Sequence, residues 1–225
     1  MAEGEFFSIV GPSGCGKTTV LSLISGLMPA SGGAVVIGGV PVTGPSREVG
    51  YMLQRDQLFE WRNIRDNVLL GLEIQKKKTP ENLAYADSLL DKYGLKEFKK
   101  HHPSQLSGGM RQRVALIRTL TTSPKILLLD EPFSALDFQT RLSVCDDVHA
   151  IIKSEKKTAV LVTHDISEAI SLSDRIAVLT ARPAMLKNIY APKLQACGSP
   201  LHRRECAEFR LWFDKIWKEL KDEKH

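Results

Sequence analysis

The sequence contains no apolar run of the roughly 18–20 residues that a membrane-spanning helix requires. No basic segment followed by an apolar segment opens it, so its start does not resemble a secretory signal peptide. Both absences predict a protein that remains on the cytosolic side and holds no membrane span of its own. The four cysteines, Cys15, Cys145, Cys197 and Cys206, show no Cys-x-x-Cys spacing, so we expect neither a zinc site nor a disulfide framework.

The net charge and the lysine runs do not indicate a particular class of binding partner. The formal net charge of +5 is modest for 225 residues, and the lysine runs at 76–78 and 99–100 are not interleaved with aromatic residues. Such runs are typical of solvated faces, and we expect no nucleic-acid partner. The length suits one large domain with a buried core, and no internal repeat is evident.

One segment predicts nucleotide binding. It is Gly11-Pro12-Ser13-Gly14-Cys15-Gly16-Lys17-Thr18, followed by Thr19, between an apolar run at 6–10 and a helical pattern at 20–27. A glycine, four free positions and Gly-Lys-Thr form a phosphate-binding loop in that strand–loop–helix context, and a glycine-rich turn that binds nothing is the alternative. Glycines let backbone N–H groups turn toward one anion, and the helix N-terminus adds its dipole. We expect Lys17 to be an exposed loop lysine that reaches the outer phosphates, and Thr18 to bind Mg²⁺.

Five further motifs follow in order. They are Gln54 after the run at 49–53, then Leu106-Ser107-Gly108-Gly109-Met110-Arg111-Gln112, the run 126–129 with Asp130 and Glu131, Ser134-Ala135-Leu136-Asp137, and Thr163-His164-Asp165. Together with the phosphate loop, these motifs resemble the landmarks of the ATP-binding-cassette (ABC) ATPases. The resemblance thins over about the last 30 residues to a general pattern.

Apolar runs that alternate with amphipathic helical stretches predict an α/β fold with a mostly parallel sheet. The expected strands are residues 5–10, 49–53, 125–129, 158–163 and 175–180. The resemblance implies a P-loop NTPase core with a helical signature subdomain, which we assign to residues 63–122, with helix caps at Thr79 and Ser107. The signature helix that starts at Ser107 would offer free N–H groups, and hence a second anion site separate from the first.

The two ends of the chain carry separate expectations. We assign residues 1–206 to the ATPase domain and 207–225 to an amphipathic helix with an apolar stripe, expected to dock on its own domain; a surface for a partner is the alternative. Family members carry antiparallel strands and an adenine-stacking aromatic residue before the first strand found here. Truncation or a misassigned start is the favoured explanation, another aromatic could substitute, and an unpaired sheet edge is expected.

The resemblance implies roles for the remaining motif residues. In this family two cassettes dimerise head to tail, and each ATP lies between one phosphate loop and the partner's signature motif. Ser107, Gly108 and Gly109 would then serve the partner's ATP, and Asp137 would organise the interface. Glu131 would polarise the attacking water and His164 would contact the γ-phosphate. Asp130, Thr18 and Gln54 would hold Mg²⁺, with Gln54 also sensing the water.

Residues 131–141, 164–169 and Thr180-Ala181-Arg182-Pro183 are most similar to the nitrate/sulfonate/taurine importer group. The resemblance implies an ATP-hydrolysing, energy-coupling subunit at the cytoplasmic face of the plasma membrane. Its partners would be a second ATPase subunit, transmembrane permease subunits and, indirectly, a solute-binding protein. Residues 54–72, with Phe59 and Trp61, would line a groove for a permease helix, or the two aromatics would simply pack the subdomain. A soluble non-transport ABC ATPase and a nucleotide-binding fragment with little turnover remain alternatives.

Overall fold

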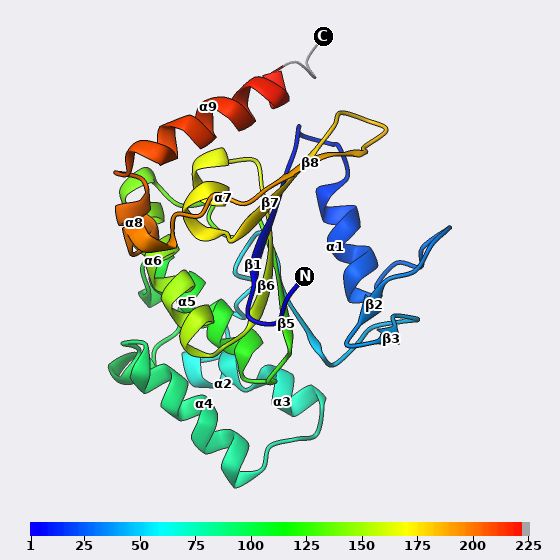
Figure 1. Ribbon diagram of the computed structural model, residues 1–225. Coiled ribbons are helices and arrows are strands. Elements are labelled where there is room, and N and C mark those ends of the chain that lie inside the picture. The colour runs from blue at the N-terminus through cyan, green and yellow to red at the C-terminus, as the bar shows by residue number, and fades with distance from the viewer. Residues whose placement is uncertain (222–225) are drawn as a thin grey trace.

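The computed structural model describes residues 1–221, so the last four residues of the predicted C-terminal segment 207–225 lie outside the described residues. Its centre is a six-stranded sheet in the order β4-β5-β6-β1-β7-β8 (Figure 1). All neighbouring strands are parallel except β8, which is antiparallel to β7. The strands are β1 (Phe6–Val10), β4 (Val49–Met52), β5 (Ile126–Asp130), β6 (Thr158–Thr163), β7 (Arg175–Leu179) and β8 (Leu186–Tyr190). The predicted α/β class and all five predicted strands are confirmed; β8 was not predicted.

The central strands are apolar on both faces because helices cover both. In β5, Leu127 and Leu129 pack into the core beneath α5 (Gly108–Leu120) and α6 (Phe138–Ser154). Leu128 between them points to the opposite face and packs with Leu21 of α1 (Lys17–Ser25). Figure 1 shows α1 on one side of the sheet and α5, α6 and α7 (Ile166–Leu172) on the other. This two-sided burial explains the continuous apolar runs of the sequence.

The segment between β4 and β5 is helical, as predicted. It contains α2 (Ile64–Val68), α3 (Leu70–Ile74), α4 (Pro80–Lys92), the 3₁₀ turns η1 (Lys96–Phe98) and η2 (Pro103–Gln105), and α5. The Thr79 hydroxyl accepts a hydrogen bond from the Asn82 N–H, and the Ser107 hydroxyl accepts one from the Met110 N–H. Both predicted helix caps are therefore confirmed.

A short hairpin lies apart from the main sheet. Its strands β2 (Val36–Ile37) and β3 (Val40–Pro41) pair antiparallel, each with the other alone in the described part of the chain. Two-residue strands carry too little periodicity for the sequence to reveal them. Across residues 1–221, no helix has the length and apolar character needed to cross a membrane.

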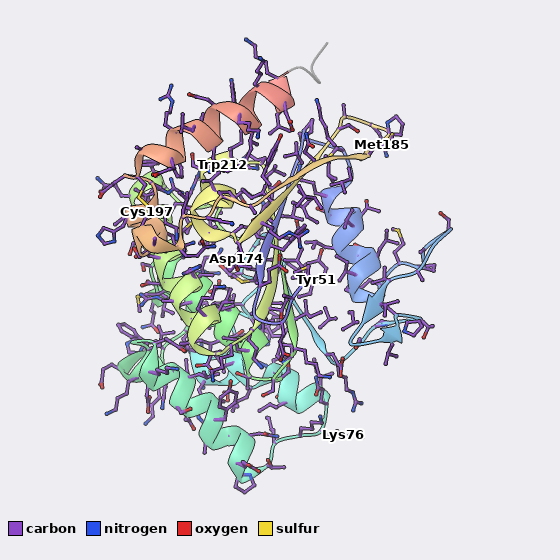
Figure 2. All side chains as sticks on the ribbon, viewed as in Figure 1. Tyr51, Lys76, Asp174, Met185, Cys197 and Trp212 are labelled. Carbon is purple, nitrogen blue, oxygen red and sulfur yellow. A yellow bond between two sulfur atoms is a disulfide. The ribbon has the colours of Figure 1, made fainter. Side chains whose placement is uncertain are left out.

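The last described element is α9 (Ala207–Lys221), which packs on the domain through its apolar stripe. Ile216 is fully buried in a cluster with Ile166 and Ile170 of α7. Trp212 lies where α9 crosses α7, and its ring is 5.7 Å from that of Tyr190 on β8 (Figure 2). The Trp217 ring stays mostly exposed and stacks on Phe213.

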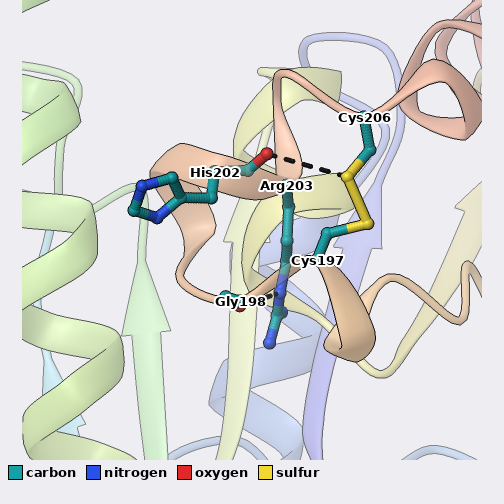
Figure 3. Close-up of a disulfide and its surroundings, with 5 residues drawn as sticks. All are labelled: Cys197, Gly198, His202, Arg203 and Cys206. Carbon is teal, nitrogen blue, oxygen red and sulfur yellow. Dashed lines mark hydrogen bonds between the residues drawn. A yellow bond between two sulfur atoms is a disulfide. The ribbon is translucent and has the colours of Figure 1, made fainter.

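The sequence predicted no disulfide framework, and the structure corrects this for one pair of cysteines. Cys197, at the end of η3 (Gln195–Cys197), is bonded to Cys206, just before α9 (Figure 3). The turn between them contains α8 (Pro200–Arg203) and brings their Cα atoms to 6.6 Å. A search for Cys-x-x-Cys spacing misses this pair because the two cysteines are nine residues apart in the sequence. Arg203 fixes this turn by donating to the Gly198 and Ser171 carbonyls.

Replacing Ile216 tests the docking of α9. Ile216→Ala leaves a cavity in a fully buried cluster, and we expect a loss of about 2 to 4 kcal/mol in the free energy of unfolding. The matched control is Leu211→Ala on the same helix, where the side chain is 70% exposed. Urea unfolding of both variants measures the difference. Equal midpoints for the two variants would contradict a docked α9.

Candidate active site

The register of three parallel strands brings the predicted site residues to one edge of the sheet. Val10 of β1 is paired with Thr163 of β6, and Val162 of β6 is paired with Asp130 of β5. The segments that follow therefore leave the sheet side by side: the loop from Gly11, the residue Glu131 and the residue His164. Parallel sheets bind ligands beyond the carboxyl ends of their strands, which is where these residues lie.

The loop after β1 has the backbone of a phosphate cradle. Gly14 and Gly16 have φ values of 76° and 106°, a region open to glycine and costly for other residues. Gly16 is the N-cap of α1, so the free N–H groups of the helix start within the loop. A Cβ atom at Gly11 would stand 2.9 Å from the Cys15 Sγ. The Cys15 side chain is itself buried, which favours a packing role in this loop.

Lys17 is held inside the loop. We expected an exposed lysine, and this is wrong: the residue is only 6% exposed. Its Nζ donates to the carbonyl oxygens of Gly11 and Pro12, both at 3.0 Å, because the loop wraps around the ammonium group. An ammonium group carries three donors, so a phosphate oxygen can bind while both contacts persist.

Asp130 collects two hydroxyl groups beside this loop. Its Oδ1 accepts from Thr18 Oγ1 and its Oδ2 from the Tyr51 hydroxyl, both at 3.2 Å. Burial raises the pKa of Asp130, and these two hydrogen bonds act against that rise. A carboxylate and a hydroxyl at one position are the oxygen donors that Mg²⁺ prefers, so the residues present fit this ion.

Tyr51 is a site residue that the sequence did not reveal. A tyrosine inside a strand is typical of a core position, and only the pairing of β4 with β5 brings its hydroxyl to Asp130. Burial and the Asp130 charge raise the pKa of Tyr51 to about 12, so its hydroxyl stays protonated and donates.

Glu131 has a strained backbone and a histidine partner. Its φ of 44° is unusual for a residue with a side chain, and such strain is concentrated at functional sites. The Glu131 N–H donates to the Val162 carbonyl at 2.8 Å, which holds the turn. His164 Nδ1 lies 3.1 Å from Glu131 Oε2, so the two predicted catalytic side chains are in direct contact.

Gln54 joins the same turn through Ser134. Its Nε2 donates to Ser134 Oγ at 3.3 Å, and that hydroxyl donates to the Glu131 carbonyl at 2.9 Å. No hydrogen bond within residues 1–221 links its side chain to Asp130 or Thr18. Its role as a Mg²⁺ ligand therefore remains a prediction, whereas its contact with the Glu131 turn is direct.

The signature residues form a second, separate element of the site. Ser107 caps α5, and Cβ atoms at Gly108 and Gly109 would stand 3.0 Å from Leu136 and 2.7 Å from Val144. The start of α5 therefore packs on the loop that ends at Asp137, which caps α6. Hydrogen bonds to Thr140 lower the pKa of Asp137 and keep it ionised. Within the described residues, no hydrogen bond or ion pair joins Ser107 to the phosphate loop.

Residues 54–62 form a surface fixed to α5 by arginines. Arg111 makes two hydrogen bonds to the Asp56 carboxylate, and Arg118 donates to the Asp56 and Gln57 carbonyls. Phe59 stacks on Trp61 at 4.7 Å, and Trp61 is 74% exposed, which contradicts the alternative that it packs the subdomain. A cavity of about 580 Å³ opens beside this loop, lined by Arg55, Asp56, Gln57, Leu58, Arg111, Gln112 and Ala135.

Comparison with known proteins identifies the family. A family model described as ABC transporter matches residues 1–134. An uncharacterized ABC transporter ATP-binding protein of Bacillus subtilis, YtlC, is 51% identical over 219 residues, covering 97% of this chain and 84% of that protein. The chain belongs to the ABC transporter ATP-binding proteins. This ABC ATPase is also 41% identical over 190 residues to the taurine import ATP-binding protein TauB of Ruegeria pomeroyi, covering 84% of this chain and 71% of that protein.

Solved structures agree with the fold and with ATP hydrolysis. The dimeric ATP-binding cassette MJ0796, in a post-hydrolysis state bound to ADP and Pi, is 32% identical to this ABC ATPase, with a TM-score of 0.69 and coverage of 85% of this chain and 87% of that chain. CbiO1 from Clostridium perfringens, part of the transporter complex CbiONQ, shares the fold at a TM-score of 0.75, covering 88% of this chain and 81% of that chain at 24% identity. The predicted P-loop NTPase fold and ATPase activity are confirmed.

Replacing Lys17 tests the phosphate loop. Lys17→Ala removes the cation at the centre of the loop, and we expect Mg-ATP binding to be lost. At a free Mg-ATP concentration of about one hundred times its Kd, binding adds about 2.7 kcal/mol to the free energy of unfolding of the wild type. Mg-ATP should add no stability to the variant. The rise in Tm on adding Mg-ATP is measured against each protein's own Tm, since Lys17 is buried. Lys125→Ala, at a surface ion pair with Glu48, is the control that should keep the full rise. An equal rise in wild type and Lys17→Ala would remove the loop from the site.

Proposed function

We propose that this ABC ATPase is the energy-coupling subunit of an importer for nitrate, sulfonate, taurine or related small organic anions. The energy-coupling part of the proposal rests on the contact between His164 and Glu131 beside Asp130 and the buried Lys17. This arrangement supports a proposed site at one edge of the sheet that would bind phosphate and a cation and supply a base. Similarity to a taurine import ATP-binding protein supports the importer and its class of solute.

Each residue has a chemical task in hydrolysis. Lys17 and the amides of residues 11–19 bind the β- and γ-phosphates. Thr18, Asp130 and Gln54 would hold Mg²⁺, which would neutralise phosphate charge when bound. Glu131 orients the attacking water and accepts its proton, since a carboxylate within hydrogen-bond reach can do both. His164 keeps Glu131 in position and contacts the γ-phosphate.

A second copy of the chain completes the site. The N-terminus of α5 offers free N–H groups, but Ser107 makes no contact with the phosphate loop within residues 1–221. Ser107, Gly108 and Gly109 of one copy would bind the γ-phosphate held by the other, with Asp137 between the two sites. The dimeric state of the MJ0796 cassette supports this arrangement.

The membrane partner would dock beside residues 54–62. An exposed Trp61 stacked on Phe59 provides an aromatic anchor, and the adjacent cavity accepts a side chain. Gln112 Oε1 is buried beside this cavity without a hydrogen-bond partner among residues 1–221, so a donor from a bound helix would satisfy it. Aromatic anchors in a groove suit a permease helix, which would hold the ATPase at the cytoplasmic face of the membrane, with a solute-binding protein acting through the permease.

Glu131→Gln tests the assigned base. The amide keeps the shape of the side chain but loses its basicity, so ATP should bind and hydrolysis should stall. Loss of a general base lowers kcat by about 10² to 10⁴. Phosphate release at saturating Mg-ATP measures kcat, and the Tm rise checks binding. Hydrolysis at the wild-type rate would exclude the role given to Glu131.

Ser107→Arg on the Glu131→Gln background tests the shared site. A bulky cation at the start of α5 blocks the N–H groups meant for the partner's γ-phosphate. ATP should still bind the monomer, while ATP-dependent dimerisation measured by light scattering should be lost. Ser88→Arg, at an exposed position of α4, is the control that should dimerise. A Ser107→Arg protein that still dimerised with ATP would exclude the shared-site arrangement.

A further inference from the structure

Arg141 connects two parts of the site that are far apart in sequence. It lies in the first turn of α6, and its Nη2 donates to the Leu136 carbonyl at 2.9 Å, just before Asp137. Its Nη1 lies 3.7 Å from Asp165 Oδ2, and its Nε lies 4.0 Å from Glu168 Oε1. One guanidinium group therefore contacts the Asp137 loop and faces both acidic residues of the segment after β6.

Glu168 in turn holds the backbone around His164. It is 3% exposed, and its Oε2 accepts from the Thr163 hydroxyl at 2.6 Å. That hydroxyl accepts from the Asp165 N–H at 3.0 Å. Thr163 and Asp165 flank His164 on its two sides, so the Glu168 carboxyl group supports, through Thr163, the backbone on both sides of His164.

The contact between Arg141 and Glu168 is incomplete. The Arg141 Nε is buried and has no hydrogen-bond partner among residues 1–221. A gap of 4.0 Å is too long for a hydrogen bond, and a shift of about 1 Å would close it. A buried donor without a partner costs free energy, so the cluster gains stability when the gap closes.

We propose that Arg141 and Glu168 are positioning residues that couple the Asp137 loop to His164. A displacement of the loop moves the Leu136 carbonyl, Arg141 moves with it and closes on Glu168, and the Thr163–Asp165 contacts transmit the shift to His164. This inference rests on the roles proposed above for Glu131, His164 and Asp137. It adds a path by which contact with a second copy reaches the catalytic side chains.

The ionisation of Glu168 gives the coupling a pH dependence. Burial, assisted by the Asp165 charge, raises the pKa of Glu168 to about 7, while Thr163, Arg141 and Arg204 act in the opposite direction. Burial also raises the pKa of the neighbouring Cys145 thiol, which stays neutral. Only the carboxylate form attracts Arg141 strongly, so coupling should strengthen as the pH rises through 7.

Stability should change in the opposite sense. Because the folded state holds a proton on Glu168 that the unfolded chain loses above pH 4.5, this group's contribution to stability decreases as the pH rises from 4.5 to 7. In Glu168→Gln, the amide keeps the contact with Thr163 and carries no charge. The Tm of this variant minus the Tm of the wild type should therefore increase between pH 5 and pH 8.

The test combines kinetics, pH and a double-mutant cycle on the full chain. We expect Glu168→Gln and Arg141→Met each to lower kcat at least about threefold with KM for Mg-ATP unchanged, and the double variant to be no slower than the slower single variant. Wild-type kcat should rise between pH 6 and pH 8, and the rise should be absent in Glu168→Gln. The control is the Lys153–Asp174 ion pair at the C-terminal end of α6, with a separation of 3.0 Å. Lys153→Met and Asp174→Asn should leave kcat and its pH profile unchanged.

Arg141→Lys separates positioning from folding, since it keeps the charge and loses the planar fork. It should retain the wild-type Tm and still lower kcat. If kcat and the pH profile match the wild type in Glu168→Gln and Arg141→Lys, while Glu131→Gln stalls hydrolysis, the coupling is excluded and the proposed function stands. If Glu131→Gln hydrolyses ATP normally, the proposed function itself fails.

Discussion

The parallel register of β1, β5 and β6 is the constraint on which the site depends. A shift of one residue would turn every side chain of a strand to the opposite face, and both faces are buried under helices. The apolar core therefore fixes which residue emerges last from each strand, namely Val10, Asp130 and Thr163. The chemical groups lie together because the hydrophobic packing beneath them admits one alignment.

The same edge of the sheet carries the unfavourable features of the chain. Glu131 has a strained backbone, at a cost of about 1–3 kcal/mol for such a residue, and Lys17, Asp130 and Glu168 are ionisable groups in buried positions. Backbone carbonyls accept from Lys17, and hydroxyl groups donate to Asp130 and to Glu168. The helices that cover both sheet faces supply the stability that allows such groups to persist.

The sequence predicted what local patterns encode. Strand positions, the Thr79 and Ser107 caps and the ordered motifs follow from apolar periodicity and residue type, and the structure has the strands and the caps in those places. It could not reveal the Tyr51 contact with Asp130, the burial of Lys17 or the bond between Cys197 and Cys206. Each of these depends on how distant or looping segments meet in space.

The two proposed anion sites, the phosphate loop and the start of α5, are attached to different parts of the fold. The phosphate loop is continuous with the central strand β1, whereas the start of α5 packs on Leu136 and α6. Because Gly108 packs closely on Leu136 and Gly109 on Val144, a movement of α5 would shift the Asp137 loop as well. The guanidinium of Arg141 is bonded to that loop and faces the acids behind His164. If a second copy binds at the start of α5, as proposed, these contacts within a single chain connect that binding to the Glu131–His164 pair.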